Sequence, residues 1–100
     1  MDKYSVKLTN RALRDLDGIY TYIAHNLLVP ETAANQADRI EGAILSLENF
    51  PARCPLRKVG AYSNRGYRQI LVDYYTAVYR IDEDKKEVII ITIRYTPSQF

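Results

Sequence analysis

One hundred residues are enough for one domain and too few for two, so every functional feature must lie on one compact body, residues 1–100. The composition, 47% hydrophobic and 26% charged, is ordinary for a globular protein and excludes a disordered chain. The net charge of +2 gives little support to polyanion binding by the molecule as a whole, and the apolar runs are too short for a signal core or a membrane span.

The beginning of the chain predicts a strand followed by an amphipathic helix. Residues 4–8 alternate apolar and polar side chains, as a strand with one buried face does. Thr9 is a suitable N-cap for the helix. The apolar stripe of this helix is Leu13, Leu16, Tyr20, Ile23 and Leu27. Asp15 and Asp17 are expected to face away from the stripe.

A second helix is predicted from Pro30 to the breakers at Asn49 and Pro51. Its apolar stripe is Ala33, Ala37, Ile40, Ile44 and Leu47. Gly42 within this helix suggests either simple tolerance or, the interpretation we favour, a close helix crossing. The short connection makes the two helices an antiparallel hairpin, whose stripes need a common surface.

The C-terminal third predicts that surface. Residues 51–66 contain too many glycines, prolines and small polar residues for a long element and are expected to form a surface loop. Three strands rich in Tyr, Val, Ile and Thr follow, at 68–72, 75–81 and 87–95, separated by short turns. The predicted fold class is therefore α+β: an N-terminal strand and a two-helix hairpin packed on one face of an antiparallel sheet with a C-terminal three-strand meander.

Alternation along the strands predicts which side chains face the helices. The expected helix-facing set on the last strand is Ile89, Ile91, Ile93 and Tyr95, and the opposite set is Val88, Ile90, Thr92 and Arg94. On the middle strand, Arg80 has the parity that can join Arg94. Burying both arginines under the hairpin would be costly, so we expect them on the helix-free face.

The basic residues are unevenly distributed. Residues 49–72 contain five basic side chains and no acidic one: Arg53, Arg57, Lys58, Arg65 and Arg68. One interpretation is a solvated basic loop, and the other is a surface that binds a target protein or nucleic acid. We take these five as the candidate target-binding or nucleic-acid-binding residues.

The sequence offers little conventional catalytic chemistry. His25 is the only histidine, and the pattern places neither Cys54 nor a serine beside it. The single cysteine cannot form an internal disulfide, and no Cys/His spacing suggests metal ligands. We expect a cytoplasmic protein without metal or cofactor and without membrane contact.

Several segments together resemble the RelE/ParE superfamily of bacterial toxins, closer to its ParE-like branch. On the helical hairpin they are Leu16–Ala24, Ala33-Ala34, and Ile40-Glu41 through Leu47 to Phe50-Pro51. On the sheet they are Tyr67–Val72, Tyr75, Tyr79–Asp82 and Val88–Tyr95. The resemblance covers nearly the whole chain and implies the toxin of a type II toxin–antitoxin module, a growth inhibitor associated with plasmid stabilization and neutralised by a cognate antitoxin.

The resemblance leaves the target open. ParE-like members bind and poison DNA gyrase, whereas RelE-like members cleave mRNA on the ribosome. RelE-like enzymes usually have arginine after the tyrosine that opens the middle strand, but Thr76 follows Tyr75 here, which favours gyrase. The alternatives are a ribosome-dependent ribonuclease or a non-toxic interaction module on the same scaffold. The candidate catalytic residues of a ribonuclease are Arg68, Arg80, Arg94 and Tyr95.

Apolar residues at two exposed places suggest antitoxin contacts, although ordinary loop hydrophobes are the other interpretation. They are Leu27, Leu28 and Val29 at the expected hairpin tip and Phe100 at the C-terminus. Nothing in the sequence decides whether the chain also forms a homodimer.

Overall fold

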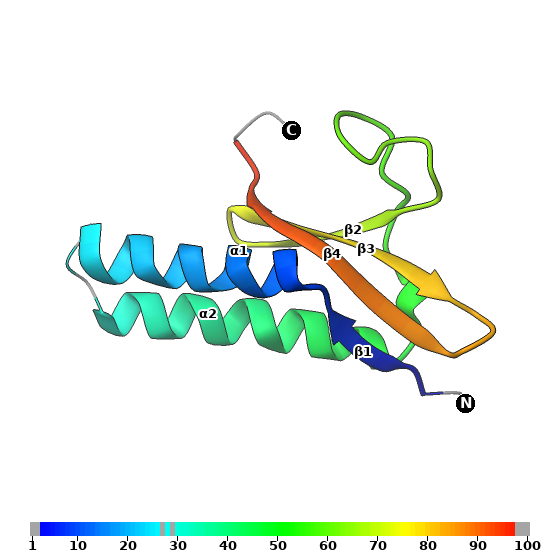
Figure 1. The fold of residues 1–100 in the computed structure, drawn as a ribbon, viewed down its shortest axis with the longest axis horizontal. Coiled ribbons are helices and arrows are strands. Elements are labelled where there is room, and N and C mark those ends of the chain that lie inside the picture. Colours follow the sequence, from blue (N-terminus) through cyan, green and yellow to red (C-terminus); the bar gives the residue numbers. More distant parts are fainter. Residues whose placement is uncertain (1–2, 27, 29, 98–100) are drawn as a thin grey trace.

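The computed structural model describes residues 3–26, 28 and 30–97. The elements in chain order are β1 (Ser5–Leu8), α1 (Asn10–Thr21), a π-helical turn (Tyr22–Asn26), α2 (Pro30–Leu45), two 3-10 turns (Ser46–Glu48 and Pro51–Arg53), β2 (Arg68–Val72), β3 (Tyr75–Asp82) and β4 (Glu87–Tyr95). The two helices form a long hairpin on one side of the sheet, and the loop before β2 rises on the other side (Figure 1). The predicted α+β architecture is confirmed.

The sheet has the order β1-β4-β3-β2, and β2, β3 and β4 form the expected antiparallel meander. β1 pairs with β4 in parallel, with Ser5 opposite Glu87 and Leu8 opposite Ile90, so the four-stranded sheet is mixed. Because β1 ends at Leu8, the second half of β4 has no strand beside it on that edge. This uncovered stretch of the β4 edge determines where α1 makes its contacts.

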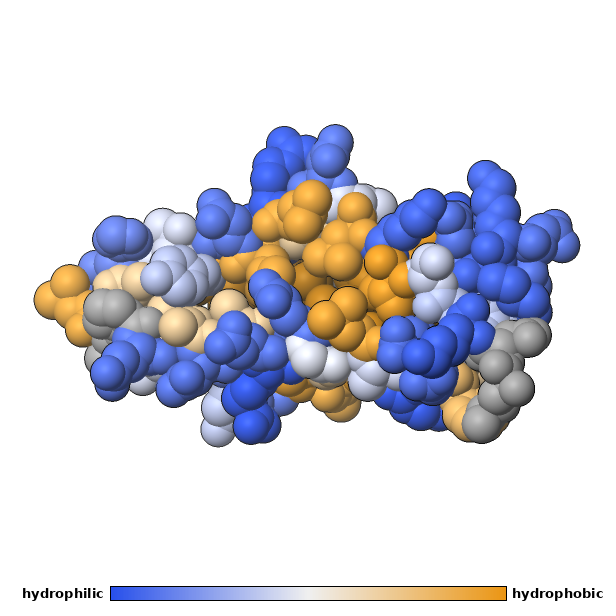
Figure 2. Space-filling view, turned by 90° about the horizontal axis from the view of Figure 1, so that it is seen from below, coloured by the Kyte–Doolittle hydropathy of each residue, from blue (hydrophilic) through white to orange (hydrophobic). Residues whose placement is uncertain are grey.

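The predicted stripe of the second helix is confirmed, because Ala33, Ile40 and Ile44 on α2 are at most 1% exposed. Gly42 on the same helix has nothing within 4 Å of an added Cβ, so the expected close crossing is wrong and the glycine is merely tolerated. Seen from below, Figure 2 shows hydrophobic surface over the middle of the molecule. Leu45 on α2 is 58% exposed.

The predicted stripe of the first helix is wrong in part. Leu13 is 52% exposed, whereas Ala12, one position earlier, is fully buried. Leu16 and Ile23 of the predicted stripe do pack inward, so the buried face is turned toward Ala12 by less than the roughly 100° of one helical residue. The cause is that α1 packs against β4 as well as α2, and the small Ala12 allows a close approach to the sheet.

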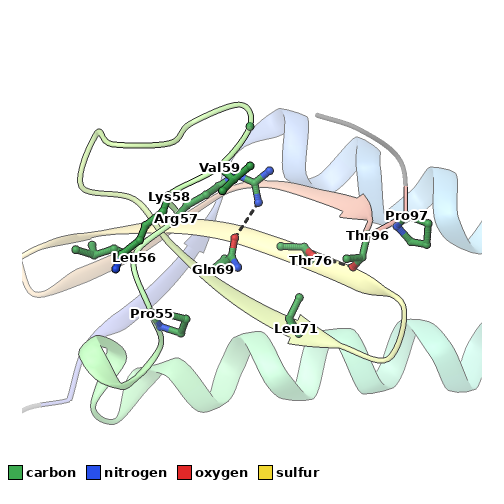
Figure 3. A pocket seen from close by; sticks show the side chains of 11 residues that line it. Pro55, Leu56, Arg57, Lys58, Val59, Gln69, Leu71, Thr76, Thr96 and Pro97 are labelled. Carbon is green, nitrogen blue, oxygen red and sulfur yellow. Dashed lines mark hydrogen bonds between the residues drawn. The ribbon is translucent and has the colours of Figure 1, made fainter.

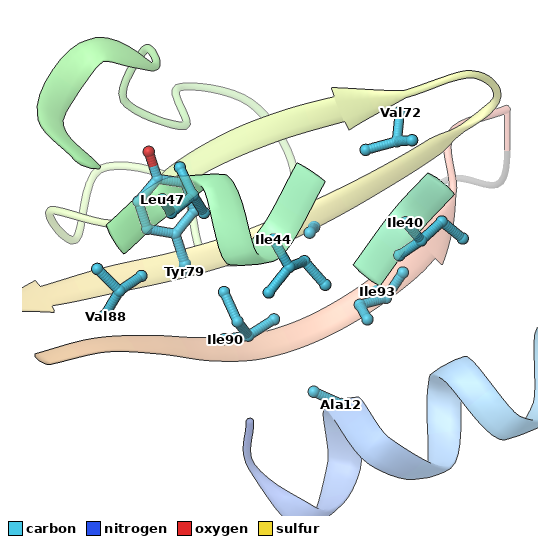
Figure 4. Packing of buried hydrophobic residues seen from close by; sticks show 10 residues of the cluster. Ala12, Ile40, Ile44, Leu47, Val72, Tyr79, Val88, Ile90 and Ile93 are labelled. Atoms are coloured by element: carbon cyan, nitrogen blue, oxygen red, sulfur yellow. The ribbon is translucent and has the colours of Figure 1, made fainter. Parts of the chain in front are cut away.

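The core lies between the hairpin and the sheet (Figure 4). Leu47 packs there with Tyr79 of β3, and Val88 and Ile90 of β4 complete the same cluster. The Tyr79 hydroxyl donates a hydrogen bond to the Pro51 carbonyl at 2.5 Å, and burial raises the pKa of this phenol, which stays neutral.

A β-bulge in β4 overturns part of the predicted alternation. Tyr79 pairs with Ile90, but the preceding Val78 pairs with Thr92, so Ile91 is an additional residue on β4. Before the bulge the prediction is wrong: Val88 and Ile90 face the helices, and Ile89, paired with Arg80, faces away. After the bulge the parity is as predicted, with Ile93 in the core and Arg94 paired with Thr76 on the other face.

The helix-free face carries Arg80 and Arg94, as expected, but it is not bare. Segment 55–60 runs along the outer edge of β2, where the Gln69 N–H donates to the Pro55 carbonyl at 3.1 Å. The loop folds back over the sheet, and Val78 on this face is fully buried. None of the described helices is long and apolar enough to cross a membrane.

Candidate target-binding groove

A groove of about 770 Å³ lies on the helix-free face, between the loop and the sheet (Figure 3). Segment 55–60 forms one wall, and Gln69, Leu71 and Thr76 of β2 and β3 form the floor. Thr96, just after β4, closes one end and shares a hydrogen bond of 2.8 Å with the Thr76 hydroxyl.

Arg57 is the central polar side chain of the groove and is only 9% exposed. Its guanidinium donates through Nε to the Ala61 carbonyl and through Nη1 to Gln69 Oε1 at 2.8 Å (Figure 3). Burial, and secondarily the positive charge of Arg94, lower the pKa of Arg57. Since arginine remains protonated at neutral pH, Arg57 holds a positive charge at a partly buried position.

The residues that line the groove include Arg57 and Lys58, and among the lining residues that the structure describes there is no aspartate or glutamate. Arginine at a fixed, partly desolvated position recognises carboxylate or phosphate groups well, because its planar donors match two oxygens. The groove can therefore bind an anionic group. The exposed apolar side chains of Val59 and Leu71 beside it can add contacts to a protein partner.

The five candidate basic residues do not form one patch. Arg57 and Lys58 line the groove, and Arg65 is exposed in the loop that follows. Arg53 turns back to the end of the 3-10 turn Ser46–Glu48, where Nη1 donates to the Asn49 carbonyl at 2.7 Å, and Arg68 donates to the Cys54 carbonyl at 2.6 Å. Arg53 and Arg68 therefore have structural contacts, which the charge run in the sequence could not reveal.

The four candidate ribonuclease residues lie on two faces of the sheet. Arg68 pairs with Tyr79 and Tyr95 with Tyr75, so both have the parity of the helix-packed side. Arg80 and Arg94 have the opposite parity. The pairing partner of Arg94, Thr76, is four residues from Arg80 on β3, which is roughly 13 Å along a strand. The four side chains are not brought together around one point.

The candidate antitoxin residues are only partly placed. Leu27, Val29 and Phe100 lie outside the described residues. Leu28 at the hairpin tip is 78% exposed and has a left-handed backbone, with φ of 57°. His25 is exposed nearby, and no group of metal-ligating side chains occurs among the residues that the structure describes.

One functional position was missed by the sequence reasoning. Asp15 was expected to face away from the packed side of the first helix, but its Oδ2 accepts hydrogen bonds from the Thr92 hydroxyl and from the Ile93 N–H, the latter at 3.1 Å. The carboxylate thus takes the place of a neighbouring strand where β1 has ended. No periodicity signal could have found this contact, because it depends on where β1 stops.

This architecture is that of bacterial toxins from toxin–antitoxin modules, as similar solved structures show. A chain from the chromosomal ParDE toxin–antitoxin system of P. aeruginosa matches with 25% identity and a TM-score of 0.76, over 93% of this chain and 96% of that one. A chain of the RelBE2 toxin–antitoxin complex of Mycobacterium tuberculosis matches with 24% identity and a TM-score of 0.65, over 95% and 93%. A mutant of E. coli toxin RelE in the free state shares the fold at 12% identity and a TM-score of 0.63, over 95% and 85%.

The family itself is defined by the sequence. The family model described as the ParE toxin of the type II toxin–antitoxin system, parDE, matches residues 6–99, and the chain belongs to this ParE toxin family. It is thus a toxin of a type II toxin–antitoxin system. No curated protein sequence gives a significant match to the chain.

Proposed function

We propose that this toxin inhibits growth by binding DNA gyrase and that it does not cleave RNA. Gyrase is the target that the ParE-like resemblance implies. The observation that carries the proposal is the division of Arg68, Arg80, Arg94 and Tyr95 between two faces of the sheet.

The chemistry of RNA cleavage explains why this division matters. Attack by a 2′-hydroxyl needs a group that takes its proton, cations around the phosphate, and an acid for the leaving oxygen, all within hydrogen-bond reach of one substrate. Tyr95 packs edge to face on Tyr75, with ring centroids 5.7 Å apart. It therefore lies away from the arginines of the helix-free face, which supports a toxin that acts by binding alone.

The groove around Arg57 is the proposed contact surface for the target. It combines buried positive charge with exposed apolar side chains at its rim, Val59 being 80% exposed. An acidic group of a protein surface would meet Arg57 and Lys58, and apolar side chains would meet Val59 and Leu71. Such a toxin acts in the cytoplasm, where gyrase and DNA are found, and a cognate antitoxin neutralises it.

The test is a supercoiling assay with purified gyrase, relaxed plasmid and purified toxin. Wild-type toxin should inhibit supercoiling, and Lys58→Glu should weaken inhibition about tenfold by placing a negative charge at the groove. Lys85→Glu is the matched control, because Lys85 is an exposed lysine in the turn between β3 and β4, outside the groove. Equal inhibition by both variants would contradict the role of the groove.

Induction in bacteria separates the remaining alternatives. A gyrase inhibitor should cause growth arrest with supercoiling defects while messenger RNA ends remain unchanged. New transcript ends on translated messages would instead establish a ribosome-dependent ribonuclease. Unaffected growth at strong expression would indicate a non-toxic interaction module.

A further inference from the structure

β2 is one of the two outermost strands of the sheet, and its outer edge is covered along only half of its length. Segment 55–57 lies beside the first half in the manner of a short fifth strand, with Leu56 paired antiparallel to Arg68. The Gln69 N–H donates to the Pro55 carbonyl at 3.1 Å. The loop thus takes the place of a neighbouring strand as far as Gln69.

Pro55 ends this pairing. Opposite residues of an antiparallel pair exchange two hydrogen bonds at such a position, but proline has no N–H to donate to the Gln69 carbonyl. The chain leaves the sheet at Cys54, whose carbonyl accepts from the Arg68 side chain at 2.6 Å. Within the part of the chain that the structure describes, the second half of the β2 edge therefore has no strand beside it.

Leu71 carries the unpaired backbone groups of this edge. The Gln69 N–H points away from β3, and residues two apart in a strand point the same way, so the Leu71 N–H and C=O also point outward. Among the described residues, none makes a hydrogen bond to either group. The Leu71 side chain is 61% exposed and lines the groove (Figure 3). An open edge beside an exposed apolar side chain is suited to the addition of a partner strand.

The surroundings of this edge indicate the chemistry of the partner. In an added strand, the residue opposite Leu71 points to the same face and would meet the Leu71 side chain, which favours an apolar residue there. Toward the Gln69 end lie Lys58 and the guanidinium of Arg57, which donates to Gln69 Oε1 at 2.8 Å. A carboxylate at that end of the added segment would be attracted by both cations.

We propose that the target adds an extended segment to the β2 edge at Leu71, with an apolar side chain beside Leu71 and an acidic one toward Arg57 and Lys58. The inference rests on the proposed function, because it describes how gyrase would occupy the groove. Backbone hydrogen bonds to Leu71 fix the segment in this arrangement, and the groove selects its side chains.

The first test removes one backbone donor. Leu71→Pro deletes the outward N–H, and proline is tolerated in an edge strand where its N–H would face solvent. Leu71→Val is the matched control, because it keeps the N–H and an apolar side chain with high strand propensity. In the supercoiling assay, Leu71→Pro should inhibit gyrase about tenfold less than Leu71→Val, as expected when a hydrogen bond is lost and its acceptor is left unpaired. Urea denaturation of both variants checks that they are folded.

Hydrogen exchange of the wild-type toxin gives a second measurement that needs no substitution. The Leu71 amide should exchange rapidly in the toxin alone and at least about tenfold more slowly when purified gyrase is bound. The Ile70 amide points toward β3 and is the internal reference, protected in both samples. This measurement decides the question if Leu71→Pro does not fold.

The outcomes separate this inference from the gyrase proposal. Equal inhibition by the two folded variants, or a Leu71 amide that still exchanges rapidly in the gyrase complex, would overturn strand addition alone. Protection of Leu71 in the toxin by itself would assign the edge to a second copy, and protection by the antitoxin but not by gyrase would assign it to the antitoxin; either result contradicts the inference. A wild-type toxin that neither binds nor inhibits gyrase would overturn both proposals.

Discussion

Replacing Asp15 by alanine should destabilise the protein strongly, although helix periodicity places this residue on an outer face. The carboxylate accepts two hydrogen bonds, from the hydroxyl of Thr92, which is fully buried, and from the N–H of Ile93, which is 2% exposed. Hydrogen bonds to charged groups contribute about 1.5–3 kcal/mol each, and a buried donor left without a partner costs about 1–3 kcal/mol. Allowing for relaxation, we expect a loss of about 3 kcal/mol, a large share of the roughly 5–15 kcal/mol of a typical domain.

Urea denaturation followed by circular dichroism measures this loss as a shift in midpoint at constant slope. Asp17→Ala is the matched control, since Asp17 is an exposed aspartate on the same helix and should change stability by no more than about 0.5 kcal/mol. Asp15→Asn should fall between the two, because an amide oxygen still accepts a hydrogen bond. Equal midpoints for Asp15→Ala and Asp17→Ala would refute the claim that Asp15 replaces a missing strand at the β4 edge.

Three further outcomes follow from the structure. Ile44→Ala removes a side chain that is 1% exposed in the core and should cost about 2–5 kcal/mol, whereas Leu45→Ala, at a position 58% exposed, should cost no more than about 0.5 kcal/mol in the same denaturation assay. Gly42→Ala should stabilise the protein by about 0.5–1 kcal/mol, because the helix gains propensity and the added methyl meets nothing; a lowered midpoint would contradict this. Hydrogen bonds from Arg39 lower the pKa of the Asp73 carboxyl. The ionised carboxylate therefore stabilises the fold above the ordinary pKa of about 4, and this stabilisation is lost as the pH falls through the lower pKa of the folded state. Asp73→Asn should therefore reduce the loss of stability measured between pH 5 and pH 2. An unchanged dependence of stability on pH would argue against the contact between Asp73 and Arg39.

The elements themselves could be predicted because each carries a strong local signal. Thr9 caps α1 as expected, its hydroxyl accepting from the Ala12 N–H at 3.1 Å, and the bounds of β2 and β4 agree with the prediction. Hydrophobic periodicity also located the buried face of α2, which packs its stripe against one surface. For α1 the same reasoning was right for Leu16 and Ile23 and wrong for Leu13, since a helix that contacts both a sheet edge and another helix has two directions of burial.

The bulge at Ile91 marks a second limit of sequence reasoning. Strict alternation assigned Val88 and Ile90 to the wrong face, because one additional residue inverts the parity of everything before it. A run of four aliphatic residues, Val88–Ile91, contains no polar position that could reveal the inversion. Arg94 lies after the bulge, on the side of the strand where the alternation holds.

The candidate site shows why a charge run is an incomplete guide. Arg53, Arg57 and Arg68 are equivalent in the sequence, yet Arg53 donates to the Asn49 carbonyl after the 3-10 turn, Arg68 donates to the Cys54 carbonyl and only Arg57 of the three lines the groove. Arginine donates to backbone carbonyls as readily as it binds anions, so its role depends on which carbonyls the fold leaves within reach. Which carbonyls lie within reach depends on long-range strand pairing, which local sequence patterns do not specify.

The distribution of acids explains how a chain with a net charge of only +2 can offer a cationic groove. Several carboxylates are engaged in holding the scaffold: Asp15 binds the β4 edge, Asp73 binds Arg39 of α2, and Glu87 binds Lys7 of β1. The charges of Asp73 and Glu87 are therefore neutralised locally by paired cations, while the described lining residues of the groove include the basic Arg57 and Lys58. Asp15 is also connected to the helix-free face through Thr92, whose Oγ1 donates to Asp15 and accepts from Arg94 Nε at 3.3 Å. One hydroxyl group thus fixes both the carboxylate that replaces a strand at the β4 edge and an arginine of the opposite face.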